Sequence, residues 1–165
     1  MTINFNKLSN FDPCIIAEMA CGHDGSFKKL KKLIEIAQKS GAKAIKFQIY
    51  KLEERANKNT KEEKIFKRLL LSNIEWKKAV RLAHKKGLFV FADIFGFESF
   101  NLAEKIKVDG YKIHSEDTLN FNFIEQVIKT KKIVMIGVGG SYRIEIKTLL
   151  DYLKNKNLIN KVILM

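Results

Sequence analysis

The chain has 165 residues, a length that predicts one domain, here residues 1–165. Hydrophobic residues make up 46% of the sequence and aromatic residues 10%, which is enough for a sizeable core. No apolar run approaches the roughly 20 residues that cross a membrane, and the first residues lack a signal-peptide core. The two cysteines are too few for a disulfide framework, so we expect a reduced, cytoplasmic protein with no membrane partner.

The formal net charge is +13, with 31 lysines and arginines. Such a charge could favour binding to an acidic partner, including nucleic acid. Only four of these residues are arginines, however, and the lysines are spread over every expected helix rather than gathered in one stripe. We therefore expect a solvated, lysine-rich surface with no nucleic-acid partner, whose field helps to attract a small anion.

Strands and helices alternate from the start of the chain. A short apolar run predicts a strand over 14–19. A helix follows, with Ser26 as its N-cap, apolar residues at helical spacing and Gly41 just past its end. The second strand is expected over 44–50, and a polar stretch over 51–64 comes after it.

The alternation continues through the second half of the chain. Ser72, followed three residues later by Glu75, is a capping-box pattern that opens a helix. Gly87 ends that helix. The remaining expected elements are, in order, helices over 62–70 and 72–86, a strand over 88–95, a helix over 97–106, a strand over 110–115, a helix over 119–129, a strand over 132–138, a helix over 144–154 and a strand over 161–165.

Short strands that are apolar on both sides and separated by helices predict an α/β fold with a parallel sheet. An open doubly wound sheet and a (β/α) TIM-type barrel are both compatible with this pattern. Polar residues at the C-terminal ends of several different strands favour the barrel. A complete barrel needs eight strands and about 250 residues, so we expect the N-terminal portion of a longer barrel, with only its first six strands.

Two lysines and a glutamate lie in or beside apolar strands. Lysine is rarely buried without a partner, so Lys46 and Lys112 could point into one site and clamp a phosphate or carboxylate. Alternatively, both could extend outward between helices. Glu18, after the first strand, could act as a general base or accept a substrate hydroxyl, or it could simply pair with one of the lysines.

Other candidate residues lie in the loops that follow the strands. His23, in "GHDG", could orient a substrate or belong only to a turn before the next helix. Ser115 could donate a hydrogen bond to a phosphate. The "GVGGS" segment, Gly137–Ser141, could offer backbone N–H groups to an anion or be an ordinary glycine-rich turn.

Five blocks of the sequence, in the same order, resemble the N-acetylneuraminate (sialic acid) synthase family. "IIAEMACGHDGS" resembles that family's "AEIGxNHxG", and "AKAIKFQIY" resembles its "ADAVKFQ". "VDGYKIHSEDTLN" is similar to "xxAYKIASGDxxN". The other two blocks, "KKGLFVFADIFGFES" and "KKIVMIGVGGSYRIEI", are similar to "KGIxFLSTPFDxES" and "KPVILSTGMxxxxEI".

The resemblance implies a TIM barrel that condenses phosphoenolpyruvate with an N-acylated hexosamine, such as N-acetylmannosamine or a bacterial relative. The product is a nonulosonic, sialic-type acid, and phosphate is released. Mn²⁺ or Mg²⁺ assists the complete enzyme, but its histidine ligands come from later strands. The resemblance therefore implies no metal bound by this chain alone, an inactive fragment when isolated, small-molecule partners and a homodimer.

The resemblance also assigns roles to individual residues. It places Glu18, His23 and Gln48 among the catalytic residues, with Glu18 on the sugar side. It places the phosphoenolpyruvate anion at Lys46, Lys112, Ser115, Gly137 and Gly139. The sequence differs from the family's patterns at Gly22, Asp24, Asp93, Ile94 and Gly137. An alternative function is a non-catalytic anion-binding or assembly module derived from the same barrel.

Overall fold

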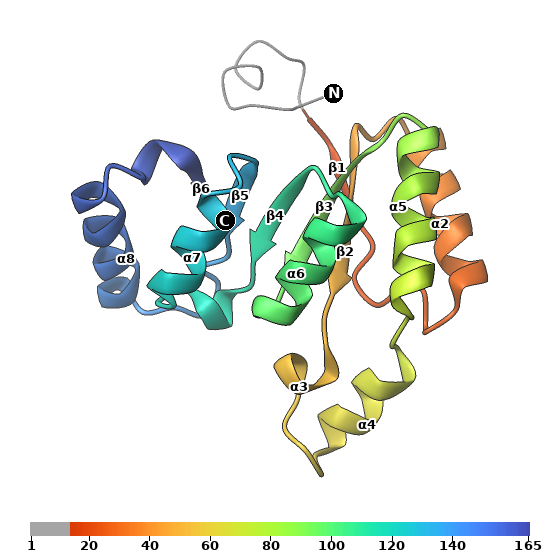
Figure 1. The fold of residues 1–165 in the computed structure, drawn as a ribbon, viewed down its shortest axis with the longest axis horizontal. Helices are drawn as coiled ribbons and strands as arrows, with labels where there is room; N and C mark the ends of the chain where they lie inside the picture. Colours follow the sequence, from red (N-terminus) through yellow and green to blue (C-terminus); the bar gives the residue numbers. More distant parts are fainter. Residues whose placement is uncertain (1–13) are drawn as a thin grey trace.

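The computed structural model describes residues 14–165 (Figure 1). Six parallel strands form one sheet, and each strand pairs with the next along the chain. The strands are β1 (Ile16–Glu18), β2 (Ala44–Ile49), β3 (Phe89–Ile94), β4 (Gly110–Ile113), β5 (Ile133–Ile136) and β6 (Val162–Leu164). Every expected strand is therefore confirmed, with differences only at its ends.

Helices connect the strands. They are α2 (Phe27–Lys39), α3 (Leu52–Arg55), α4 (Lys61–Arg68), α5 (Asn73–Lys85), α6 (Phe97–Ile106), α7 (Phe121–Ile128) and α8 (Arg143–Asn155), with 3₁₀ turns η1 (Ser115–Asp117) and η2 (Ile159–Lys161). The short helix α3 was not expected, since it lies within the polar stretch. The helix expected from residue 119 begins later, because the Asn120 side chain accepts a hydrogen bond from the backbone N–H of Phe123.

Local sequence accounts for the helix ends. The Ser26 side chain caps α2, and Ser72 and Glu75 form the expected capping box of α5. Gly41 and Gly87 follow the ends of α2 and α5 with positive φ angles of 80° and 78°. Glycine adopts this conformation without a steric penalty, which explains why both helices stop there.

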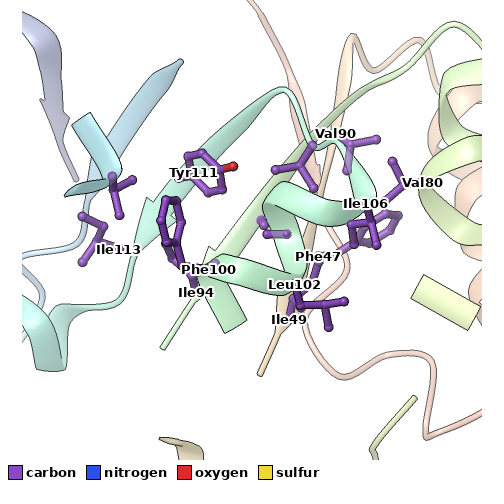
Figure 2. Close-up of a cluster of buried hydrophobic side chains, with 14 of the residues drawn as sticks. Phe47, Ile49, Val80, Val90, Ile94, Phe100, Leu102, Ile106, Tyr111 and Ile113 are labelled. Atoms are coloured by element: carbon purple, nitrogen blue, oxygen red, sulfur yellow. The ribbon is translucent and has the colours of Figure 1, made fainter. Parts of the chain in front are cut away.

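The strand order settles the architecture in favour of the barrel. A doubly wound sheet reverses its strand order at a switch point, whereas here the order runs from β1 to β6 without reversal. The main hydrophobic core lies between one face of the sheet and the helices, and Figure 2 shows part of it. The chain therefore folds as a half-barrel of six strands with α2, α5, α6, α7 and α8 on the outer face, whereas α3 and α4 lie beyond the carboxyl end of β2 (Figure 1).

The opposite, inner face of the sheet changes character along the strands. Near the start of the strands it carries a small apolar cluster of Ala44, Phe91, Ile133 and Met135. Gly110 leaves room for the Phe91 ring, because a Cβ atom there would lie 2.3 Å from the ring. Near the carboxyl ends of the strands, the same face carries charged and polar side chains.

Candidate functional site

The polar end of the inner face is produced by the alternation of side chains along the strands. On β2, Ile45, Phe47 and Ile49 belong to the outer core, so Lys46 and Gln48 project to the inner face. The register places Glu18 beside Lys46.

The next row of the sheet holds three polar residues side by side. Gln48 pairs in register with Asp93 of β3, and Asp93 pairs with Lys112 of β4. Side chains in register on parallel strands point to the same face. Residues far apart in the sequence therefore meet at one end of the half-barrel, as the sequence predicts for Glu18, Gln48, Lys46 and Lys112.

The two lysines are paired with carboxylates. Lys46 is 7% exposed, and its Nζ contacts the Glu18 carboxylate and lies 3.8 Å from Oδ2 of Asp93. The Lys112 Nζ donates a hydrogen bond of 3.0 Å to the same Asp93 oxygen. These four side chains, Glu18, Lys46, Asp93 and Lys112, form what we call the lysine–carboxylate network.

The electrostatics of Lys46 reflect its burial. Removal from water lowers the pKa of its ammonium group, and the positive charge of Lys112 lowers it further, while Asp93 opposes both effects. An anion placed beside the two lysines would favour their charged forms in the same way as Asp93 does. The network can therefore bind an anion, provided that the lysines turn from their carboxylate partners.

His23 lies in the interior of the loop between β1 and α2, which we call the first loop. It is 1% exposed, its Nδ1 accepts a hydrogen bond of 3.1 Å from the backbone N–H of Gly25, and its ring contacts the Trp76 ring edge-on. Its Nε2 has no hydrogen-bond partner within residues 14–165. Burial lowers the pKa of His23, so the neutral ring is favoured. These contacts hold the loop in shape.

Gln48 is linked to the same loop. The Cys21 Sγ lies 3.6 Å from Oε1 of Gln48, within the distance of a weak thiol hydrogen bond. Burial raises the pKa of the Cys21 thiol, with a smaller opposing effect from Arg55. Gln48 thus lies between the first loop and the lysine–carboxylate network.

Ser115, Gly137 and Gly139 lie after β4 and β5. A Cβ atom on Gly137 would approach the backbone nitrogen of Ser115 to 3.3 Å and Cε of Lys112 to 3.6 Å, so Gly137 packs directly against both residues. Ser115 and Gly139 line an open pocket of about 350 Å³ together with Glu116, Thr118, Leu119, Gly140, Ser141 and Glu145. Neither lysine of the network lines this pocket, which lies beside the network rather than over it.

A cluster at the same end of the sheet was not anticipated from the sequence. The Arg55 guanidinium of α3 lies 4.2 Å from the centre of the Phe66 ring and 5.0 Å from that of Phe95. The His114 ring stacks on Phe95 at 4.6 Å. Glu116 approaches Arg55 to 3.7 Å and His114 to 3.8 Å. Because α3 was not expected, the position of Arg55 in this cluster could not be predicted from the sequence.

The described residues do not fit a metal centre. Within residues 14–165, no group of three or more His, Cys, Asp or Glu side chains lies close enough to hold a metal ion. In the same part of the chain, no helix combines the length and the apolar character needed to span a membrane.

Comparison with known proteins identifies relatives of the chain. An uncharacterized protein of Methanocaldococcus jannaschii is 34% identical over 127 residues, which are 77% of this chain and 38% of that protein. The pseudaminic acid synthase of Campylobacter jejuni strain 81-176 is 29% identical over 139 residues, 76% of this chain and 40% of the enzyme. The chain thus spans about two fifths of the length of these curated relatives.

A solved structure shares the fold. It is the N-acetylneuraminic acid (sialic acid) synthetase of Leptospira borgpetersenii in complex with citrate. The TM-score is 0.83 at 30% identity, over 94% of this chain and 54% of the synthetase. The sequence pattern of the NeuB family matches residues 33–165, from within α2 to the last residue. The chain therefore belongs to the NeuB family, and its relatives include sialic-type acid synthases.

Proposed function

We propose that the protein to which this chain belongs condenses phosphoenolpyruvate with an N-acylated hexosamine to give a nonulosonic acid. In this reaction the methylene carbon of phosphoenolpyruvate bonds to the aldehyde carbon of the sugar. Water adds to the neighbouring carbon of phosphoenolpyruvate, and inorganic phosphate leaves. The observation that carries the proposal is the meeting of Lys46 and Lys112 with Glu18 and Gln48 at one end of the inner face.

The proposed roles follow from position and charge. The buried Lys46 and the partly buried Lys112 hold the carboxylate and phosphate of phosphoenolpyruvate, because ammonium groups with little access to water bind anions strongly. Ser115 and the backbone N–H group of Gly139 extend the anion site towards β5. The N–H group of Gly137, which the sequence suggested as a further donor, already donates a hydrogen bond of 3.0 Å to the carbonyl oxygen of Ile113. The citrate bound to the Leptospira relative is consistent with a carboxylate-binding site in this family.

The remaining candidate residues lie on the side of the first loop. Glu18, which is exposed beside the buried Lys46, faces the sugar aldehyde and orients its hydroxyl groups. Gln48 positions the reacting groups between the sugar and the anion. His23 acts on the reaction by ordering the loop that follows Glu18, since its contacts are with Gly25 and Trp76.

A divalent cation belongs to the proposal for the whole enzyme only. Mn²⁺ or Mg²⁺ would polarise the aldehyde oxygen as a Lewis acid. Because residues 14–165 offer no cluster of three suitable ligands, no step is assigned to a metal held by this part of the protein.

The proposal is tested by phosphate release from phosphoenolpyruvate. The full-length protein is incubated with Mn²⁺ or Mg²⁺ and a panel of N-acyl hexosamines, and phosphate is measured with time. Lys112→Ala should lower kcat/KM by at least about a hundredfold, because it removes a charge-assisted contact to the anion. Lys46→Ala should have a similar effect.

The matched control is Lys147→Ala. Lys147 is an exposed lysine of α8 that pairs with Asp151, far along the chain from the network. This variant changes the net charge equally and should keep the parent activity. Absence of sugar-dependent phosphate release with every sugar, or equal losses in all three lysine variants, would contradict the proposal.

A second candidate is the anion-binding or assembly module without catalysis. It is favoured by the neutralisation of both lysines by Glu18 and Asp93. In that case the full-length protein would bind phosphoenolpyruvate in a titration but release no phosphate with any sugar.

A further inference from the structure

Asp93 is the most buried member of the lysine–carboxylate network. It is 1% exposed and lies at the end of β3, between Lys46 of β2 and Lys112 of β4. Its Oδ2 accepts the hydrogen bond from Lys112 and lies near Lys46, whereas its Oδ1 is buried without a hydrogen-bond partner in residues 14–165. A buried carboxylate oxygen without a partner is costly, so this arrangement calls for an explanation.

The charges of the network are balanced. Two ammonium groups face two carboxylates, so the four side chains carry no formal net charge between them. The two lysines are therefore already paired with carboxylates and are not free cations. An anion that enters the site must take Lys112 away from Asp93, and then lies next to a carboxylate that has little access to water.

We propose that Asp93 is a built-in counter-ion that determines which charge of anion the two lysines accept. It competes with the ligand for Lys112 and Lys46, and it repels the bound ligand in proportion to the ligand's own charge. The site therefore discriminates against highly charged phosphate-bearing anions relative to singly charged carboxylates. This inference rests on the proposed anion site at the lysines, but not on the condensation reaction.

The register explains why Asp93, rather than Glu18, has this role. Asp93 lies in the same row of the sheet as Gln48 and Lys112 and contacts both lysines. Glu18 contacts only Lys46 of the pair and is exposed, so water screens its charge. A charge at Asp93 is thus felt fully by any anion held between the two lysines.

The test compares two ligands in the full-length wild-type protein and in Asp93→Asn, which keeps the shape of the side chain and removes its charge. Phosphoenolpyruvate and pyruvate are titrated by calorimetry at one pH and ionic strength. Removing a nearby unit charge should tighten phosphoenolpyruvate binding on the order of tenfold. Pyruvate carries less charge, so its affinity should rise only about two- to threefold.

Controls separate this effect from a change in net charge or in folding. Asp151→Asn removes an exposed carboxylate of α8 and should leave both affinities unchanged. If Asp93→Asn does not fold, Asp93→Thr provides a second uncharged variant. Threonine is the residue at this position in the family pattern that the sequence resembles. Adding Lys112→Ala to the Asp93 variant should abolish the gain in phosphoenolpyruvate affinity.

Two results would overturn the inference. One is an affinity for phosphoenolpyruvate that is unchanged or weaker in the uncharged Asp93 variants. The other is an equal gain for both ligands, since a purely structural role of Asp93 would not depend on ligand charge. The affinities are measured without a sugar, so an inactive enzyme that shows the charge-dependent gain contradicts the proposed reaction but not the role of Asp93.

Discussion

Buried lysines are the most informative single residues in this chain. Lysine seldom lies inside a protein, because its ammonium group loses its hydration there. The placement of Lys46 and Lys112 within apolar strands therefore predicts either an anion site or two lysines that extend outward between the helices. In the structure, both lysines lie on the inner face with carboxylate partners, and neither extends outward between the helices.

His23 should make the stability of the fold depend on pH. Burial lowers its pKa below the ordinary value of 6.5, so the unfolded chain binds a proton at a higher pH than the folded chain. The free energy of unfolding should therefore decrease as the pH falls below 6.5, by about 1.4 kcal/mol for each unit by which the pKa is lowered. Urea unfolding between about pH 5 and pH 8 measures this decrease.

His23→Gln is the variant that isolates this contribution. It should flatten the pH dependence while lowering stability at neutral pH, because the contact with Trp76 is lost. His114, whose pKa burial also lowers, titrates in both proteins and contributes to the slope that remains. Parallel pH curves for the two proteins would show that His23 does not titrate differently on folding.

At the scale of elements, capping residues and apolar spacing determined most boundaries. The helix α3 is the exception, because four residues without a side-chain cap carry almost no local signal. Its stability comes from contacts made elsewhere: the Glu54 carboxylate accepts hydrogen bonds from the backbone N–H groups of Glu98 and Ser99 at the start of α6. Those contacts also hold Arg55 over Phe66 and Phe95.

Gly25 connects the first loop to α4, and its replacement should be unusually destabilising. Its φ is +67°, and a Cβ atom there would lie 2.2 Å from the carbonyl oxygen of Arg68. Gly25→Ala should therefore lower the free energy of unfolding by at least about 2–3 kcal/mol, from backbone strain and steric overlap together. Urea unfolding of the variant tests this prediction.

Gly41→Ala is the matched control for Gly25→Ala. Gly41 also has a positive φ, of 80°, but a Cβ atom there would meet no other atom within 4 Å. Only the conformational penalty of about 1 kcal/mol is expected. If the two variants lost equal stability, close packing of the first loop against α4 would not contribute.

At the scale of the molecule, the net charge of +13 should increase the rate at which anions reach the site. Raising the salt concentration from about 0.02 M to about 0.5 M should slow phosphoenolpyruvate association by roughly tenfold, because ions screen the field. Stopped-flow fluorescence can follow the association through Trp76, the one tryptophan of residues 1–165. The association rate of pyruvate should decrease less, because pyruvate carries less charge. An association rate of phosphoenolpyruvate that does not depend on salt would exclude electrostatic attraction.

Local sequence patterns were sufficient to predict the alternation of strands and helices, the caps of α2 and α5, and the two lysines as candidates for an anion site. These features depend on local spacing, which the backbone geometry of strands and helices converts directly into structure. The α/β barrel class followed from the same pattern, and the order of the six strands confirms it.

The partners of those residues, in contrast, depend on the assembled fold. In the sequence, Asp93 is distinguished only as a polar residue near the end of a strand, at a position where the chain differs from the family pattern. Its position between Lys46 and Lys112 depends on the register of three strands that lie far apart in the chain. Likewise, the burial of His23 against Trp76 and the place of Arg55 over Phe95 depend on how loops and helices pack. Local spacing carries no information about such contacts, because they arise only when the whole sheet and its helices have assembled.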